Sequence, residues 1–321
     1  MNGTDFLKKS KAYYALNRDA SEKRIAHAYM IISTDTQSAD TLADLFLAEC
    51  VIGNSDEQSV EKIRRGGYAD VMRIPRGDKI LVDDVKQVTD TVYFTPTELD
   101  KKFYIIDKFE TANASSQNKL LKVLEEPPKS VVFIIKCANK SAVLPTVLSR
   151  VREVEIAPMP EEEITEYLIE KYGESPKVYV ASALSNGYIG LAEEIMKGKK
   201  EAEMFNACLE TLKGMKNSKQ VLHFSVKLSA FKDGLSRLVK IFELLLCDCM
   251  RASTGARAEL RFKSNVREIT ELSEEFTIET VLKLREPLLR AQSRLELNGN
   301  NQSVLDELLF SILEVKAKCR K

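Results

Sequence analysis

The sequence predicts an α/β core with a parallel sheet in the N-terminal half of the chain, followed by helices without strands. The first observation is a pair of apolar runs, residues 102–107 and 130–136, both rich in β-branched and aromatic side chains. The second is the helical spacing of Leu120, Leu121 and Leu124 between these runs. Strand, helix and strand in this order form the βαβ unit of a parallel sheet, whose ligands bind beyond the strand ends.

The elements before this unit follow from local patterns. Residues 5–17 place apolar side chains between lysines, which predicts an amphipathic helix that covers the core. The apolar residues 28–33 predict the first strand of the sheet. A helix follows through residues 42–47, and Ser38 or Asp40 is expected to cap its N-terminus.

Prolines and glycines divide the rest of the chain. The pair Pro127 and Pro128 ends the helix of the βαβ unit, and Pro158 and Pro160 mark the end of the α/β core. The remaining expected elements are a turn and short strand within residues 66–75, a helix from residue 82, three short helices at residues 161–172, 175–184 and 190–197, and a bundle of about five helices from residue 201.

Composition limits the class of protein. The 321 residues carry 48 Lys+Arg and 48 Asp+Glu, and this zero net charge argues against a general polyanion binder while leaving a local basic face open. No apolar run approaches the ~20 residues that cross a bilayer, and the first residues lack a signal-peptide pattern, so we expect a cytoplasmic protein without membrane contact. The six cysteines lack disulfide-scaffold spacing and are expected to be reduced thiols.

Residues 105–150 carry a family resemblance. They contain IID, QNKLLKVLEEPP, VVFIIKCAN and LPTVLSR in that order, preceded upstream by His27, Ala28 and Tyr29. These motifs resemble the clamp-loader branch of the AAA+ ATPases, in particular the family of delta-prime subunits of bacterial DNA polymerase III. The resemblance implies a P-loop NTPase-like α/β AAA+ core with a parallel sheet, a small helical lid and an all-α C-terminal collar. These domains are expected at residues 1–157, 158–200 and 201–321, respectively.

The loop after the first strand lacks the phosphate-binding sequence. A nucleotide-binding member of this superfamily has G-x-x-x-x-G-K-[ST] here, because glycines let backbone N–H groups wrap the phosphates and the lysine neutralises them. This loop has no glycine and no lysine, and Asp35 and Asp40 place negative charge where a triphosphate would lie. We therefore predict a degenerate loop that binds no cofactor; it consists of Ser33, Thr34, Asp35, Thr36, Gln37, Ser38, Ala39 and Asp40.

Two further positions depart from the pattern of an ATPase. ATPases of this branch end the strand with Asp-Glu, of which the first acid coordinates magnesium and the second polarises water; this chain has Asp107 and Lys108. The lid helix of the family carries an arginine that touches the γ-phosphate, where this chain has Leu191. The resemblance thus implies no ATP hydrolysis at this chain's own site, and Asp107 is expected to have a structural role such as capping a helix.

Ser149 and Arg150 retain the serine-arginine pair of the family. In the family this pair lies at the subunit boundary, and the arginine reaches the γ-phosphate bound by the neighbouring subunit, as an arginine finger. A guanidinium suits this task because it is always charged and presents a planar fork to phosphate oxygens. The alternative is that Arg150 joins a surface charge network with Arg152, Glu153 and Glu155, which would contribute little.

The sequence offers little for a metal site or for direct contact with DNA. Many delta-prime-like proteins carry a four-cysteine zinc module in the region of Cys50, but this chain has a single cysteine there, so no metal is expected. Residues 111–119 offer hydroxyls and amides at a helix start, which could contact a DNA backbone or simply be solvated.

The prediction is a non-hydrolysing subunit of a heteromeric clamp loader, in which Arg150 acts in trans during sliding-clamp loading. The implied partners are a gamma/tau-like ATPase subunit, a delta-like subunit, and the sliding clamp and primed DNA through the assembled complex. Two alternatives stay open, namely the ATPase motor subunit of the same complex and a purely structural scaffold. ATP binding by the isolated chain would favour the first, and unchanged ATPase after replacement of Arg150 would favour the second.

Overall fold

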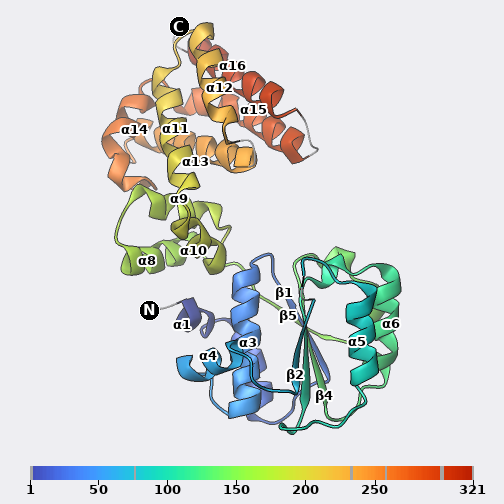
Figure 1. The fold of residues 1–321 in the computed structure, drawn as a ribbon. Helices are drawn as coiled ribbons and strands as arrows, with labels where there is room; N and C mark the ends of the chain where they lie inside the picture. The colour runs from blue at the N-terminus through green and yellow to red at the C-terminus, as the bar shows by residue number, and fades with distance from the viewer. Residues whose placement is uncertain (1–2, 76, 232–233, 257–258, 297–299, 320–321) are drawn as a thin grey trace. The chain divides into compact units, whose positions relative to one another are not determined.

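The computed structural model of this protein describes residues 3–75, 77–231, 234–256, 259–296 and 300–319. The chain divides into two compact units (Figure 1). The first unit comprises Met1–Met159 together with the short segment Tyr188–Gly190, and the second comprises Pro160–Gly187 and Leu191–Lys321. The finer division into three domains at residues 157 and 200 stays a prediction.

The described part of the first unit contains a five-stranded parallel sheet, which confirms the predicted fold class. The strand order is β2-β3-β4-β1-β5, so β1 lies between β4 and β5. Because all paired strands are parallel, the carboxyl ends of β1, β3 and β4 lie at one edge of the sheet. The strands are β1 Ala28–Ile32, β2 Val71–Ile74, β3 Lys102–Ile106, β4 Val131–Cys137 and β5 Arg152–Glu155.

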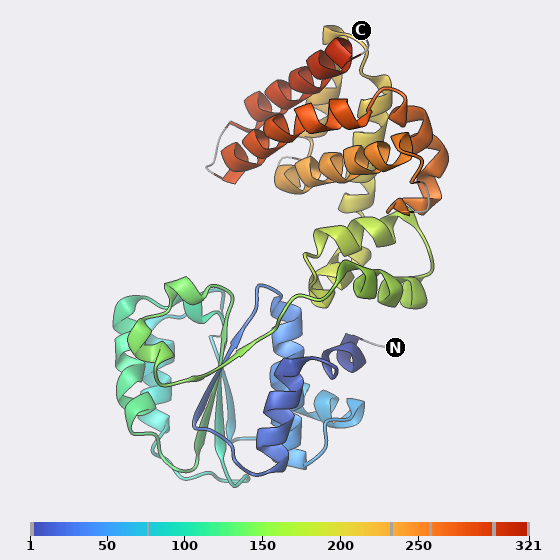
Figure 2. The ribbon, with the colours of Figure 1, turned by 180° about the vertical axis from the view of Figure 1, so that it is seen from behind.

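Helices cover both faces of this sheet (Figures 1 and 2). Val132 and Ile134 of β4 pack with α2 (Lys11–Ser21) and α3 (Thr36–Ile52), whereas Phe133 and Ile135 face α5 and α6. Burial of both faces explains why the strands are continuous apolar runs rather than alternating ones. The other elements of this unit are α1 Gly3–Leu7, α4 Glu57–Arg64, α5 Val82–Thr91, α6 Ala114–Glu125, α7 Pro145–Leu148, and the 3₁₀ turns η1 Phe109–Thr111 and η2 Lys140–Ala142.

Two sequence predictions about helix starts were wrong. The single helix expected at residues 5–17 is two helices, because Ser10 has extended backbone angles and its hydroxyl accepts a hydrogen bond from Tyr13 N at 3.1 Å, which starts α2. The cap of α3 is Asp35, whose Oδ1 accepts from Ser38 N at 3.0 Å, rather than Ser38 or Asp40. Asp35 supplies the extended backbone that a cap requires, whereas Ser38 and Asp40 already lie inside the helix.

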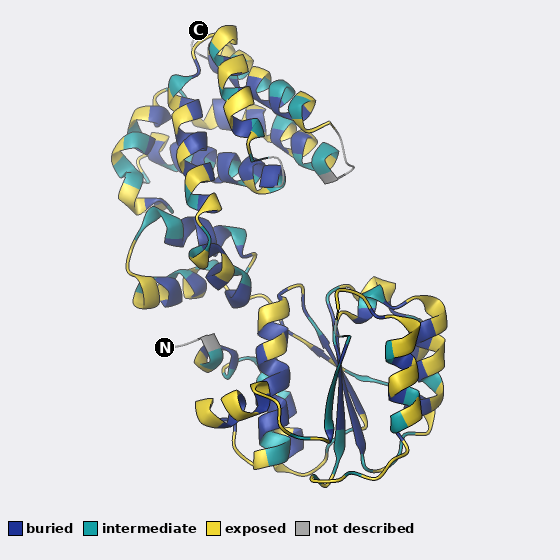
Figure 3. Ribbon diagram, viewed as in Figure 1, coloured by how far each residue is buried: buried dark blue, intermediate teal, exposed yellow. Residues whose placement is uncertain are grey.

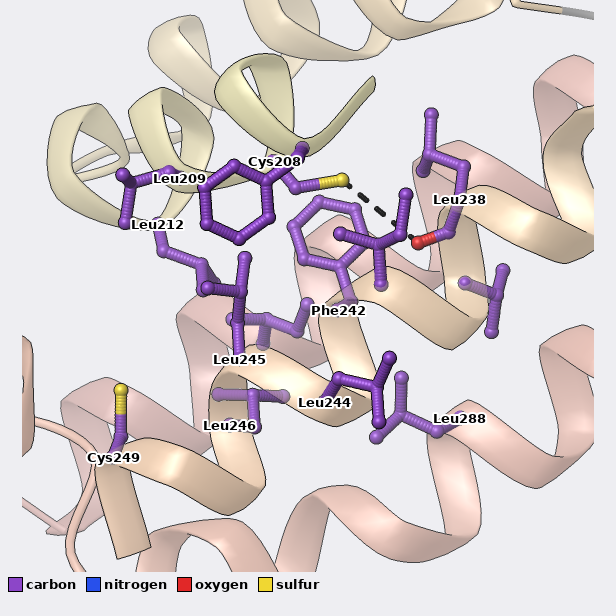
Figure 4. Packing of buried hydrophobic residues seen from close by; sticks show 14 of the residues in the cluster. Cys208, Leu209, Leu212, Leu238, Phe242, Leu244, Leu245, Leu246, Cys249 and Leu288 are labelled. Atoms are coloured by element: carbon purple, nitrogen blue, oxygen red, sulfur yellow. Dashed lines mark hydrogen bonds between the residues drawn. The ribbon is translucent and has the colours of Figure 1, made fainter. Parts of the chain in front are cut away.

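The described residues of the second unit form helices joined by turns, without a strand among them. Most of the buried side chains after residue 200 belong to one hydrophobic cluster, to which α9, α11, α13, α15 and α16 all contribute, and Figure 4 shows Cys208 beside Leu238 and Phe242 within it. In Figure 3 the inward sides of these helices are buried and their outer sides exposed. After residue 200 the described chain has six α-helices rather than about five. Before residue 200 the helices are α8 Glu161–Tyr172, α9 Pro176–Leu184 and α10 Ile189–Lys197. After it they are α11 Lys200–Gly214, α12 Ser218–Ser229, α13 Leu235–Ser253, α14 Val266–Ser273, α15 Ile278–Glu296 and α16 Asn301–Cys319, with the 3₁₀ turn η5 Lys263–Asn265.

Candidate functional site

Arg150 lies two residues after the end of the short helix α7 and keeps its side chain partly in solvent. The guanidinium donates from Nη1 to Thr146 O at 2.7 Å and to Ser149 Oγ at 3.0 Å. Its Nη2 atom lies 2.7 Å from Glu125 Oε1 at the end of α6, and the two side chains are 33% and 47% exposed. The hydroxyl of Ser149 therefore helps to orient the arginine beside it.

Three motifs that are far apart in the sequence meet at Arg150. Glu125 belongs to the LLKVLEEPP segment, and His27 Nε2 lies 3.0 Å from the Arg150 carbonyl oxygen. The neighbouring charges are engaged elsewhere, because Arg152 pairs with Asp19 and Glu153 with Lys140. Sequence reasoning missed Glu125 as the partner, although the residue stands inside the quoted motif.

A buried glutamine joins α6 to α7, the helix that precedes Arg150. The Gln117 side-chain amide donates to Ala112 O at 3.0 Å and to Ala142 O at 2.9 Å, and its oxygen accepts from Leu144 N at 2.8 Å. Leu144 is the N-cap of α7 and Pro145 its first residue. Within residues 111–119, Asn113 caps α6 and Thr111 accepts from Ile80 N, so these polar groups serve the fold.

Asp35, in the loop after β1, is buried: only 1% of the residue is exposed. Its carboxylate accepts from Ser38 N at 3.0 Å, from Ser38 Oγ at 2.5 Å and from Gly190 N at 2.8 Å. Asp35 N in turn donates to Ser33 Oγ at 3.0 Å. Thr34, Thr36 and Gln37 are exposed, whereas Ala39 is buried.

Lys136 of β4 carries the only charge of that strand, and its side chain is 8% exposed. The ammonium lies 2.7 Å from Asp107 Oδ1 and donates to Asp40 Oδ1. Asp107 Oδ1 receives no hydrogen bond within the described residues, so its contact with Lys136 is ionic. Sequence reasoning missed Lys136, which the charge inside an otherwise apolar strand could have revealed.

The helix-cap role expected of Asp107 is wrong. The N-cap position of the following 3₁₀ turn belongs to Lys108, which has a left-handed φ of 53°. Lys108 Nζ also pairs with the exposed Asp78 at 3.0 Å. Asp107 is instead one of the two carboxylates that neutralise Lys136. The chain turns away from β3 only at the next residue, the left-handed Lys108.

Leu191 lines a cavity of about 1050 Å³ in the second unit, together with Ile195 and Leu282.

Burial raises the pKa of the Cys50 thiol to about 12, with Glu49 adding to the effect, and burial also raises the pKa of the Cys137 thiol to about 11. Within the described residues no group of three His, Cys, Asp or Glu side chains could hold a metal ion. In the same residues no helix combines the length and apolar character of a membrane span.

Comparisons with known proteins place both halves of the chain. A family model described as DNA polymerase III, delta subunit, matches residues 8–160, and one described as DNA polymerase III, delta subunit, C terminal, matches residues 202–313. The DNA polymerase III subunit delta' of Bacillus subtilis is 24% identical over 318 residues, which are 94% of this chain and 94% of that protein. A crystal structure of a gamma subunit-related protein of Thermotoga maritima, 21% identical, matches with a TM-score of 0.50 over 95% of this chain and 100% of that chain, which shows a common fold.

Subunits of another type match over the first half alone. The DNA polymerase III subunit tau/gamma of Haemophilus influenzae is 28% identical over 161 residues, or 48% of this chain and 23% of that protein. The subunit gamma of Buchnera aphidicola from Acyrthosiphon pisum is 26% identical over 171 residues, or 51% of this chain and 47% of that protein. The chain thus spans less than half the length of these curated relatives.

Proposed function

The chain belongs to the delta-subunit family of DNA polymerase III clamp loaders, and we propose that it is a non-hydrolysing, delta-prime-like subunit that supplies Arg150 to ATP held by a neighbouring ATPase subunit. The partners of this proposal are a gamma/tau-like ATPase subunit and a delta-like subunit. The sliding clamp and primed DNA would be met through the assembled complex. The role of the chain is to couple ATP hydrolysis in the neighbouring subunit to clamp loading in DNA replication.

One observation carries the proposal, namely the way Arg150 is held. Its backbone is fixed by His27 and by the end of α7, while its side chain stays one-third exposed at the surface of the first unit. A fixed backbone with an exposed planar cation is what an arginine finger requires, because the fork must reach phosphate oxygens of another subunit. A guanidinium buried in the core of this chain could not do so.

The ion pair with Glu125 is compatible with this role. Exposed pairs contribute about 0.2–1 kcal/mol, because water and salt screen both charges. A γ-phosphate carries more charge than one carboxylate and accepts a bidentate contact from arginine. Exchange of Glu125 for phosphate when a neighbouring subunit docks therefore costs little and gains a stronger interaction.

The loop after β1 supports the non-hydrolysing part of the proposal. Residues 33–40 contain neither glycine nor lysine, and the Asp35 carboxylate already accepts a hydrogen bond from Ser38 N at the start of α3. Backbone N–H groups at a helix start are the donors that hold phosphate in a nucleotide loop. In this chain one of these donors, Ser38 N, serves the Asp35 side chain.

The test is Arg150→Ala in the reconstituted clamp loader, with clamp and primed DNA present. We expect hydrolysis at the neighbouring site to fall roughly 10³-fold or more, as for other arginine fingers. In a single-turnover experiment the burst would therefore lose the ATP held at that one site, while ATP binding persists. Arg150→Lys is expected to restore little, because an ammonium lacks the planar fork.

The matched control is Arg65→Ala, which removes an exposed arginine that pairs with Glu61 at 3.0 Å on α4. This variant should leave both the burst and the assembly unchanged. If Arg150→Ala assembles normally and retains the full burst, the finger role is rejected and the chain acts as a scaffold.

A further inference from the structure

The fold family implies a magnesium nucleotide at the loop after β1, and the residues present there do not fit one. We propose that this loop is a self-occupied site, in which the Asp35 carboxylate and the Lys136 ammonium fill the positions that an anionic ligand and its counter-ion would take. The inference deepens the proposed loss of nucleotide binding. Its test uses the isolated chain, so its failure would leave the proposal for Arg150 untouched.

Asp35 takes the place of an anionic ligand. Parallel sheets bind ligands beyond the carboxyl ends of their strands, and Asp35 lies three residues after the end of β1, with α3 starting at the next residue. Its two oxygens accept from Ser38 N, Ser38 Oγ and Gly190 N. Donation by backbone N–H groups to one buried anion is the same chemistry by which helix starts hold phosphate.

Gly190 leaves room for this internal anion. The segment Tyr188–Gly190 belongs to the first unit, and Gly190 N donates to Asp35 Oδ2 at 2.8 Å. A Cβ atom at this position would collide with the Asp35 carboxylate. The backbone therefore approaches the carboxylate as closely as glycine allows, and no space is left between them for a phosphate group.

Lys136 takes the place of a counter-ion. Its buried ammonium lies between Asp40 of α3 and Asp107 at the end of β3, so it neutralises two carboxylates that face the same strand edge. Without that cation, two negative charges would remain close together and partly out of water, which is costly. The chain thus carries its own cation where a ligand's counter-ion would otherwise be needed.

The first experiment measures thermal unfolding of the isolated chain with Lys136→Met. Loss of a buried partner should lower the midpoint by about 5 °C or more. Removing both facing charges in Lys136→Met/Asp40→Asn/Asp107→Asn should recover most of that loss, since the repulsion is gone. Lys140→Met is the control, because Lys140 pairs with Glu153 but is 49% exposed, and its midpoint should change little.

Failure of the triple variant to regain stability, or an equal loss in Lys140→Met, would overturn the role of Lys136. The second experiment addresses Asp35 through Asp35→Ala, which removes the anion and leaves its donors unpaired. Inorganic phosphate at constant ionic strength should then raise the midpoint of the variant in a saturable way and leave the wild type unaffected. Asp35→Asn keeps a cap without the charge, and we expect an intermediate loss of stability and a weaker phosphate effect.

Equal responses of wild type and both Asp35 variants to phosphate would reject an internal anion at this position. Direct binding gives a further check. Magnesium ADP carrying a fluorescent label should show no saturable binding to the wild-type chain, and saturable binding would overturn the self-occupied site.

Discussion

The contacts of Arg150 make its availability depend on one acid. Glu125 is the carboxylate that holds the guanidinium within this chain, at 2.7 Å, while Thr146 O and Ser149 Oγ hold its other nitrogen. Both ionic partners are partly in water, so the pair contributes little to folding. Glu125 therefore sets how readily the arginine exchanges partners, rather than whether the unit folds.

Glu125→Gln is expected to leave folding almost unchanged, with a free energy of unfolding within about 1 kcal/mol of the wild type. In the reconstituted complex it should match or exceed wild-type ATPase, because Arg150 is released from its partner in the same chain. Burst kinetics and a urea titration would measure the two effects. A loss of ATPase as large as that of Arg150→Ala would mean that the pair itself is required.

Asp70, directly before β2, offers a pH test of stability. Its burial favours a raised pKa, but hydrogen bonds from Glu98 N, Leu99 N and Thr97 N outweigh burial and hold the pKa of Asp70 below its usual value near 3.8. A carboxyl with a depressed pKa stabilises the fold above its unfolded pKa, and this contribution disappears as pH falls through the folded pKa.

We therefore expect the wild type to lose this stability as pH falls below about 4, and Asp70→Asn to show a flatter profile with lower stability at pH 7, by about 1–3 kcal/mol. Urea unfolding at each pH is the measurement. Parallel pH profiles of the two proteins would show that other carboxylates dominate acid unfolding.

The helices α6 and α7 act as one support for the arginine. Gln117 is buried inside α6 and satisfies three backbone groups, of which two lie in the segment that leads into α7. The periodicity of the sequence predicts α6 but not this connection, because an amide side chain in a helix usually points to solvent. Its burial fixes the position at which α7, and hence Arg150, leaves the sheet.

Gln117→Ala should cost about 1–3 kcal/mol, because buried backbone donors and acceptors lose their partners. We expect a smaller ATPase burst in the reconstituted complex as well, since Arg150 would no longer be held in one place. Asn118→Ala on the exposed side of the same helix is the control and should change neither quantity. Loss of stability with a full burst would separate Gln117 from the positioning of Arg150.

The molecule as a whole has separate hydrophobic cores in its two units. The sheet of the first unit is covered by one cluster on each face, and the second unit has a cluster of its own that joins the short helix α9 to the bundle. Neither of the clusters in the first unit includes a residue of the second unit. Each unit therefore has the apolar interior that a cooperative transition needs.

Matched substitutions in the two cores test this independence. Ile134→Val in β4 and Ile241→Val in α13 each remove one methylene from a fully buried side chain and should each cost about 0.5–1.5 kcal/mol. In calorimetry each variant should lower one transition by a few degrees and leave the other in place. A single transition lowered equally by both variants would show that the units unfold as one.

The local patterns of the sequence determine the elements of this protein. Apolar β-branched runs specify β1, β3 and β4, and helical periodicity with prolines specifies the helices of the second unit. Set against the phosphate loop of the family it resembles, the missing glycines and lysine predict a degenerate loop. Each of these properties depends on a few consecutive residues, so a single sequence is enough to predict it. Cap residues were less predictable, because Ser38 and Asp40 are as suitable chemically as Asp35 and only the backbone decides.

The tertiary structure alone decides which distant residues meet. His27 lies 123 residues from Arg150, Asp40 lies 96 residues from Lys136, and Asp35 lies 155 residues from Gly190. No local pattern encodes these contacts, since they arise only when the parallel strands lie side by side. His27 and Arg150 then meet at the amino ends of β1 and β5, and Asp40 and Lys136 at the carboxyl ends of β1 and β4. The sequence therefore determined which residues were available for chemistry, and the fold determined that Glu125 holds Arg150 and that the chain's own ions meet beyond β1.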